Sequence, residues 1–194
     1  MKTKLTILAI TICAFFNLNA QDQNTSKAGI KFGYNLAAVS FDGETETGQR
    51  HSFHAGFYGE SFLNEAIALQ IEFLYSQQGY ELKDSSGTFT QKLDYINLPV
   101  MFKAYPSTNI FLETGPQVGY AISHKEEFDS SFGVFDTSQE FEPRNFDWGV
   151  NFGGGLKTNS GLSFGVRYHL GLGDIYDEGN PQNRVWQFSL GFDF

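Results

Sequence analysis

Several kinds of residue are scarce in this chain, and each shortage narrows what the protein can be. The single cysteine, Cys13, lies in the apolar N-terminal stretch, so disulfide bonds contribute nothing to the rest of the chain. Positive charge is scarce as well, because 13 Lys and Arg residues stand against 22 Asp and Glu. That balance argues against nucleic acid as a partner, since phosphates need basic side chains. Beyond the N-terminus, no run reaches the roughly 18 apolar residues of a membrane-spanning helix.

The N-terminus has the features of a cleavable export signal. Residues 1–4 are basic, residues 5–16 are apolar but too short to span a membrane, and cleavage is expected after Ala20. A lipoprotein anchor at Cys13 does not fit, because bulky Ile12 precedes it and apolar residues follow. Removing the signal leaves 11 basic and 22 acidic side chains. We expect a signal peptide over 1–20, a short N-terminal segment over 21–27 and the folded domain over 28–194.

Aromatic residues, at 16% of the total, and glycines, at 21, are abundant in the chain. Because segments with a helical period are scarce, this composition favours an all-β protein. The last segment alternates strictly, so one strand face is apolar and the other polar, as in a strand between lipid and a polar lumen. Eight segments of about ten residues show this alternation, a length typical of tilted membrane strands. They are Ala28–Leu36, Phe53–Phe62, Ile67–Ser76, Tyr95–Ala104, Ile110–Ile122, Asp147–Lys157, Leu162–Leu170 and Arg184–Phe194.

The connections between these segments alternate in length. Long polar loops are expected over 38–52, 77–94, 123–146 and 171–183, and tight turns over 63–65, 105–108 and 158–161. Long loops at one end and short turns at the other, with an even strand count, are typical of outer-membrane barrels. Closure is required because lipid offers no partner to an unpaired strand edge. The sequence therefore predicts an eight-stranded antiparallel up-and-down transmembrane β-barrel, with both termini at the periplasmic end.

Aromatic residues support this orientation of the strands. Where the predicted strands meet the long loops, the outward positions carry rings that favour the membrane–water boundary. The alternative is that β-proteins simply use many aromatic residues. The predicted interfacial rim consists of Tyr34, Phe53, Tyr75, Tyr120, Trp148, Tyr168 and Trp186.

The predicted inward face carries charged side chains. An eight-stranded barrel is just wide enough for side chains to fill it, so these charges should pair inside a filled polar lumen. A proton or ion path is the alternative. The salt-bridged core is the favoured interpretation, and it argues against an open diffusion pore. The predicted lumen network is Lys31, Glu60, Glu72, Lys103, Glu113, Arg167 and Asp193.

No catalytic, metal or cofactor site is predicted. The four histidines lack the spacing of a zinc site, and the calcium-loop spacing is missing from the acidic residues of the last loop. A hydrolytic triple of Ser52, His51 and Asp42 can be drawn at the barrel rim, but no nucleophile motif accompanies it.

The third loop is the longest, and it is both acidic and aromatic. It is either a solvated connection or a docking surface for a protein partner. The candidate partner residues are Glu126, Glu127, Phe128, Phe132, Phe135 and Phe141.

Short motifs in a fixed order carry a resemblance to a known family. They are Gly29–Asn35, Glu72–Gly79, Tyr95–Pro99, Lys103, Gly115–Pro116, Arg167–Tyr168, Gly171–Ile175 and Phe194. In this order the chain resembles the outer-membrane β-barrel domain of the PorT-like "porin family" of Bacteroidota over residues 26–194. The resemblance implies an eight-stranded outer-membrane barrel inserted by the barrel-assembly machinery, which recognises a terminal aromatic strand. It implies no shared biochemical activity.

Three functions from different classes remain open at this point. The leading hypothesis is a non-enzymatic integral outer-membrane protein, in contact with outer-membrane lipid, that has a structural or docking role. The second is a secreted lipocalin-like barrel that binds a small apolar ligand, because alternation alone does not say which face is inside. The third, an outer-membrane hydrolase, needs a catalytic triad that the sequence does not show.

Overall fold

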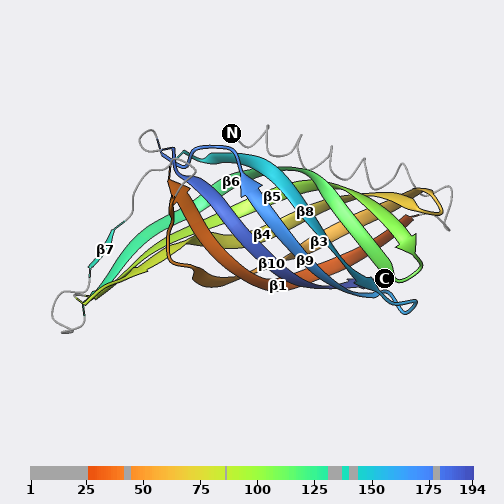
Figure 1. Ribbon diagram of the computed structural model, residues 1–194, viewed down its shortest axis with the longest axis horizontal. Helices are drawn as coiled ribbons and strands as arrows, with labels where there is room; N and C mark the ends of the chain where they lie inside the picture. Colours follow the sequence, from red (N-terminus) through yellow and green to blue (C-terminus); the bar gives the residue numbers. More distant parts are fainter. Residues whose placement is uncertain (1–25, 42–44, 86, 131–136, 140–143, 177–179) are drawn as a thin grey trace, which may run out of the picture.

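A computed structural model describes residues 26–41, 45–85, 87–130, 137–139, 144–176 and 180–194. This part of the chain is almost entirely β-strand (Figure 1). No helix within it is long and apolar enough to cross a membrane. The strands are β1 (Ser26–Phe41), β2 (Thr45–Glu46), β3 (Arg50–Asn64), β4 (Ile67–Lys83), β5 (Gly87–Ser107), β6 (Ile110–Ser130), β7 (Thr137–Gln139), β8 (Phe146–Lys157), β9 (Leu162–Gly171) and β10 (Gln182–Asp193).

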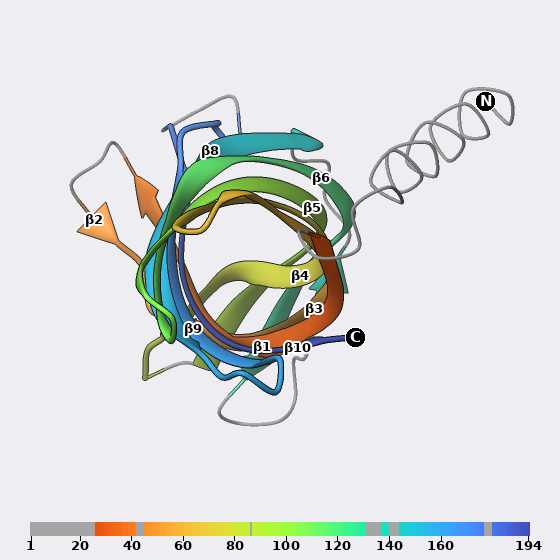
Figure 2. The same cartoon turned by 90° about the vertical axis from the view of Figure 1, so that its right-hand side faces the viewer.

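Eight of these strands form a closed antiparallel ring. Neighbours in sequence are neighbours in the sheet, and β1 closes the ring by pairing with β10 from Gly29↔Asp193 to Ser40↔Gln182. Figure 2 looks into the ring from the end that carries the short turns. The strands β2 and β7 are short additions that pair with β1 and β6. Closure leaves no unpaired edge around the ring, as lipid requires, and the predicted eight-stranded up-and-down barrel is confirmed.

The two faces of the sheet differ in the sense that the alternation predicts. Large apolar side chains point outward on every ring strand, and polar side chains point into the lumen, where many are buried. Inward glycines make room for rings that cross the lumen. At Gly29, an added Cβ would lie 2.3 Å from the Tyr58 ring, and at Gly155 it would lie 2.7 Å from the Phe111 ring. The core of this barrel is therefore polar, with aromatic rings fitted against glycine.

Strands extend into three of the four predicted long loops. The predicted loop 77–94 is a hairpin, because β4 continues to Lys83 and β5 begins at Gly87. The strand β6 likewise continues to Ser130, within the predicted loop 123–146. In the predicted loop 38–52, β1 continues to Phe41 and β3 begins at Arg50. Outside lipid the outer strand face meets water, so the apolar–polar alternation weakens and the sequence pattern is typical of a loop. In Figure 1 these extensions of β4, β5 and β6 project from one end of the barrel.

The opposite end of the barrel carries three tight connections. Two of them are centred on Glu65–Ala66 and Thr108–Asn109. In the third, Gly161 has a φ of +85°, a left-handed conformation that favours glycine. Both ends of the described chain lie at this short-turn end (Figure 1).

Candidate functional site

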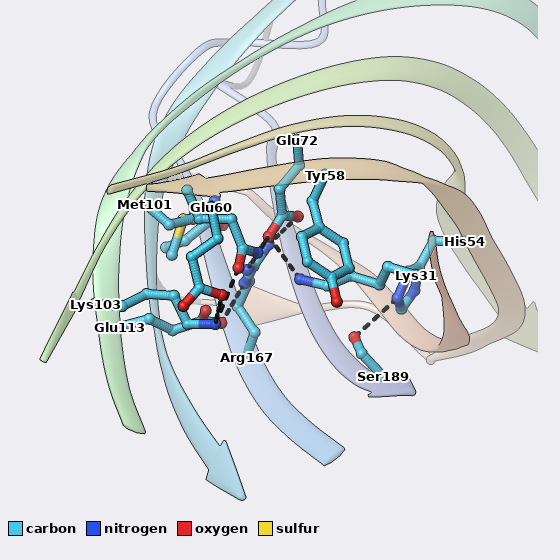
Figure 3. Close-up of polar contacts among 12 residues, drawn as sticks. Lys31, His54, Tyr58, Glu60, Glu72, Met101, Lys103, Glu113, Arg167 and Ser189 are labelled. Atoms are coloured by element: carbon cyan, nitrogen blue, oxygen red, sulfur yellow. Dashed lines mark hydrogen bonds and ion pairs between the residues drawn. The ribbon is translucent and has the colours of Figure 1, made fainter. Parts of the chain in front are cut away.

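The strongest concentration of charge in the described chain lies in the middle of the lumen. The guanidinium of Arg167 on β9 forms a bidentate pair with Glu72 on β4, through Nη2–Oε1 at 2.7 Å and Nη1–Oε2 at 2.9 Å. Its Nε also donates to Glu113 Oε1 on β6 at 2.8 Å, and Lys31 Nζ on β1 donates to Glu72 Oε1 at 2.6 Å. We call Lys31, Glu72, Glu113 and Arg167 the central cluster (Figure 3). Because strands across the ring supply these groups, the cluster bridges the lumen.

A second group of charges lies nearer the short turns. Lys157 Nζ donates to Glu60 Oε2 at 2.8 Å and lies 3.1 Å from Asp193 Oδ2, while Lys103 lies 3.6 Å from Glu60. The hydroxyls of Tyr58 and Tyr105 add further bonds, to Asp193 at 2.5 Å and to Glu60 respectively. We call Glu60, Lys103, Lys157 and Asp193 the turn-end cluster. Its buried carboxylate Glu60 therefore meets two cations and a hydroxyl.

Gln70 joins the two clusters into one network. It donates to Glu72 Oε1 at 2.5 Å and accepts from Lys103 Nζ at 3.0 Å. Together the clusters hold four carboxylates and four cations, so the network carries no net charge. The cavity beside it measures about 10 Å³, which is room for roughly one water molecule.

All seven predicted lumen charges thus lie on the inner face, and the structure brings them together in these two clusters. Lys157 was missed, although it has the inward parity of Asn151, because it is the last strand residue before a turn. Gln70 was missed because it is uncharged, and no sequence signal identifies which polar residue joins two clusters. The pairings across the lumen depend on the stagger of the strands, which the sequence does not reveal.

Three residues near the central cluster have the arrangement of a nucleophile, a base and an orienting group. His54 Nε2 lies 2.9 Å from Ser189 Oγ, and His54 Nδ1 lies 2.7 Å from Asn35 Oδ1 (Figure 3 shows His54 and Ser189). The Asn35 amide nitrogen donates to the Gln77 carbonyl at 2.8 Å, so its oxygen accepts from the histidine. Ser189 also lines the small cavity beside the central cluster. These contacts satisfy buried polar groups.

The other drawn triple, Ser52, His51 and Asp42, is not assembled. His51 is exposed on the outer face, where it contacts the Tyr34 hydroxyl, whereas Ser52 is buried inside and donates to the Gln77 carbonyl. Neighbouring residues of a strand point to opposite faces, so these two cannot meet. Asp42 lies outside the described residues.

Apolar side chains close the lumen at the long-loop end. Tyr80, Leu93 and Tyr95, from β4 and β5, pack with Ile175 from the β9–β10 connection. Val39 and Ala121 complete this set, which we call the mouth cap. Burial raises the pKa of the adjacent Tyr176 hydroxyl, with Tyr80 and Glu126 adding to the effect. The cap thus ties one loop to the walls of the barrel.

The seven residues of the predicted aromatic rim all point outward, and several contact one another. The rings of Tyr168 and Trp186 lie 4.8 Å apart, and those of Phe53 and Tyr75 lie 5.7 Å apart. Tyr34, Tyr120 and Trp148 are exposed on the same face. The last strand, β10, ends at Asp193, and the backbone N–H of the next residue, Phe194, donates to the Ala28 carbonyl at 2.9 Å.

Half of the candidate partner residues lie on the projecting part of β6. Glu126, Glu127 and Phe128 pair with β5 on one side and with β7 on the other. Glu127 also forms an ion pair with Lys92. Phe132, Phe135 and Phe141 lie outside the described residues.

The four histidines do not gather. His54 and His169 point into the lumen from different strands, and His51 lies on the outer face. Within the described ranges, no group of three or more His, Cys, Asp or Glu side chains is placed to hold a metal ion.

An apolar exterior around an ion-paired lumen defines an integral membrane β-barrel, whose outer surface requires lipid. The chain belongs to the family described as "Outer membrane protein beta-barrel domain", which it matches over residues 19–177, and it is an outer-membrane protein. A secreted lipocalin-like barrel is therefore wrong, because the apolar face is on the outside and the lumen is charged.

Solved structures show the same fold. The chain is similar to the attachment invasion locus protein Ail of Yersinia pestis, with a TM-score of 0.52 and 16% identity over 88% of this chain and 99% of Ail. It is also similar to Neisserial surface protein A, with a TM-score of 0.54 and 13% identity over 86% of this chain and 97% of that one. A comparison with curated proteins finds no match.

Proposed function

We propose that this protein is a closed, non-enzymatic outer-membrane barrel whose projecting hairpins dock a protein partner. The observation that carries the proposal is the bidentate pair between Arg167 and Glu72, which crosses the lumen with both side chains buried. An ion path needs water along its length, and the space beside this pair holds roughly one water molecule. The mouth cap supports closure of the lumen at a second place, the long-loop end.

Conductance in planar bilayers tests the closed state. The wild-type barrel should show negligible conductance, because a permeating ion would have to break several buried ion pairs. The double variant Glu72→Ala/Arg167→Ala removes both partners of the pair, so it leaves a wider lumen and should conduct measurably more. A large, stable open state in the wild type would contradict the proposal.

The docking role is supported by the shape of the projecting sheet. The strands β4, β5 and β6 extend as paired hairpins instead of mobile polar loops, so they present a fixed surface. Crosslinking in the native envelope, followed by pull-down, should recover a partner with the intact protein and lose it when residues 126–141 are deleted. A deletion that keeps the same partners would refute a docking role for this segment.

The partner of this chain is expected to differ in charge from the polysulfated ligand that was crystallised with Ail. Ail has been crystallised with the heparin analogue sucrose octasulfate. This chain has a net charge of −9, and its outer hairpins mix acids with bases. Because like charges repel, a polysulfated ligand is a poor fit here. A protein partner that contributes basic or aromatic side chains suits the surface better.

We also propose that the chain is PorT-like, that residues 1–20 are a cleaved signal peptide and that the barrel-assembly machinery inserts it. The terminal aromatic residue Phe194, 75% exposed, supports the last point. Deletion of Phe194 should reduce the folded fraction in the outer membrane, measured by the heat-induced shift of gel mobility. Phe57→Ala, which truncates another exposed aromatic residue inside β3, is the control and should have a smaller effect.

A further inference from the structure

A polar cluster beneath the mouth cap has no role in the closure described above. Asn97, Asp147, His169 and Asn183 come from β5, β8, β9 and β10, and each is at most 3% exposed. We call them the mouth-side cluster. The amide nitrogen of Asn183 lies 3.5 Å from the hydroxyl of Tyr95, a residue of the cap. The cluster therefore lies inside the lumen directly under the cap, toward the long-loop end of the barrel.

Two of these side chains approach the Asp147 carboxylate. Asn183 Nδ2 donates to Asp147 Oδ2 at 3.0 Å, and His169 Nε2 lies 3.7 Å from the same oxygen. Asn97 lies over Gly119, since a Cβ at that glycine would come within 2.5 Å of Asn97 Oδ1. Gly119 pairs with Asp147 on the next strand. Gly119 therefore places no side chain between Asn97 and Asp147.

Hydrogen bonding assigns the proton on His169. Its Nδ1 lies 2.9 Å from Asn151 Oδ1, while the Asn151 amide nitrogen donates to Gln117 Oε1 at 3.1 Å. The Asn151 oxygen is therefore an acceptor, so His169 Nδ1 carries the hydrogen and Nε2 presents a lone pair. That lone pair faces the carboxylate of Asp147, so two acceptors meet without a donor between them. Metal-binding histidines show this same arrangement, with the second ring nitrogen bonded to an oxygen.

In the mouth-side cluster, the buried side-chain atoms without a partner are nearly all acceptors. They are Asp147 Oδ1, Asn183 Oδ1, Asn97 Oδ1 and His169 Nε2, against one donor, Asn97 Nδ2. A proton on His169 would satisfy one acceptor, and the Tyr95 hydroxyl hydrogen another. A cation satisfies several acceptors at once, because each can direct a lone pair at it.

We propose that the mouth-side cluster binds one divalent transition-metal cation, through Asp147 and His169 with the amide oxygens of Asn97 and Asn183. An imidazole nitrogen beside a carboxylate oxygen is a donor pair that such ions prefer. Their separation of 3.7 Å is too long for a hydrogen bond and is spanned by two metal–ligand bonds of about 2 Å. The ion would tie β5, β8, β9 and β10 together beneath the cap.

Zinc uptake by the folded protein tests the proposal. Full-length mature protein is refolded in detergent with Zn²⁺, dialysed, checked for folding by its heat-induced gel shift, and analysed for zinc by mass spectrometry. Zinc is supplied during refolding because the cluster is buried. About one Zn²⁺ per folded barrel is expected in the wild type, and at least tenfold less in Asp147→Asn and in His169→Gln.

His54→Gln is the matched control, because it removes a buried lumen histidine whose ring nitrogens both have partners. It should keep the full zinc content.

Asn97→Asp removes no hydrogen bond and adds a negative charge, so it should tighten zinc binding at least tenfold even if the other variants fail to fold. A wild-type barrel without stoichiometric zinc would mean a hydrated polar cluster only. Equal zinc in the wild type and in both loss variants would mean binding elsewhere, and either result overturns the proposal.

Discussion

At the scale of single residues, this barrel is held by contacts that a soluble protein rarely places at its centre. Arg167 meets two carboxylates, Glu72 and Glu113, and all three side chains are at most 7% exposed. The attraction between buried charges offsets a desolvation cost of several kcal/mol per ion only when every charge has a partner. The network is thus stable as a whole and sensitive to the loss of any one member.

Replacing Arg167 by Met should therefore destabilise the barrel by about 3–5 kcal/mol, because it leaves two carboxylates buried without their shared cation. Urea unfolding in lipid or detergent, followed by gel mobility, measures the change. The triple variant Arg167→Met/Glu72→Gln/Glu113→Gln should recover much of the loss, since no isolated charge remains. Lys83→Met, which breaks an exposed pair with Glu81 on the projecting hairpin, is the control and should cost less than about 1 kcal/mol.

Glycine positions inside the lumen test how tightly the rings are fitted. Gly29→Ala would bring a methyl group to 2.3 Å from the Tyr58 ring and to 2.5 Å from the Phe192 carbonyl oxygen. Because the carbonyl belongs to the neighbouring strand, relaxation is costly, and we expect a loss of about 1–3 kcal/mol in the free energy of unfolding. Gly165→Ala is the matched control, since its nearest neighbour lies at 3.6 Å. Equal stability of the two variants in urea would contradict this account.

At the scale of elements, the connections are more ordered than polar loops usually are. Ile175 lies in the β9–β10 connection, yet it is only 2% exposed and packs in the mouth cap. Its backbone N–H donates to the Pro181 carbonyl at 2.8 Å, and its own carbonyl accepts from Arg144 at 2.9 Å. One apolar side chain thus fixes a loop over the mouth of the barrel.

Ile175→Ala should loosen this loop while leaving the ring intact. Truncating a buried isoleucine costs about 2–5 kcal/mol, and here the cost falls on the docked loop before it falls on the ring. Hydrogen exchange of residues 172–176 should accelerate at least tenfold, whereas amides in the centres of β9 and β10 keep their protection. Leu172→Ala, at a position 37% exposed, is the control and should change little. Uniform acceleration across the barrel would show that the cap and the ring unfold together.

The sequence predicts those elements whose environment is strongly asymmetric. All eight ring strands were found because lipid on one side and a polar lumen on the other impose a clear alternation. The projecting parts of β4 and β5 have the sequence pattern of a loop, since Gln77, Gln78 and Gly79 give no such contrast. Parity alone located inward charges such as Glu72. The partners across the lumen, and the convergence of Asp147 with His169, follow from strand stagger and need the structure.

At the scale of the whole molecule, the distribution of polarity reverses that of a soluble protein. Residues such as Phe57, Leu112 and Phe152 are more than half exposed on the outer face, and carboxylates lie within. Surface of this kind is stable only when lipid covers it, because a continuous apolar belt in water promotes association. The belt, the rim of aromatic rings and the projecting hairpins together give the barrel a direction in the membrane.

That direction can be measured with single introduced cysteines, because cleavage of the proposed signal peptide removes Cys13, the only natural thiol. A cysteine at Lys83, on the projecting β4–β5 hairpin, should react with a membrane-impermeant maleimide in intact cells, because long hairpins of outer-membrane barrels face outward. A cysteine at Asn159, in the exposed β8–β9 turn, should react only after the outer membrane is permeabilised. Both variants lie outside the apolar belt, so neither should disturb insertion, and the heat-induced gel shift verifies this. Labelling at Asn159 but not at Lys83 in intact cells would mean that the barrel is inserted the other way round, and a partner for its hairpins would then have to be sought in the periplasm.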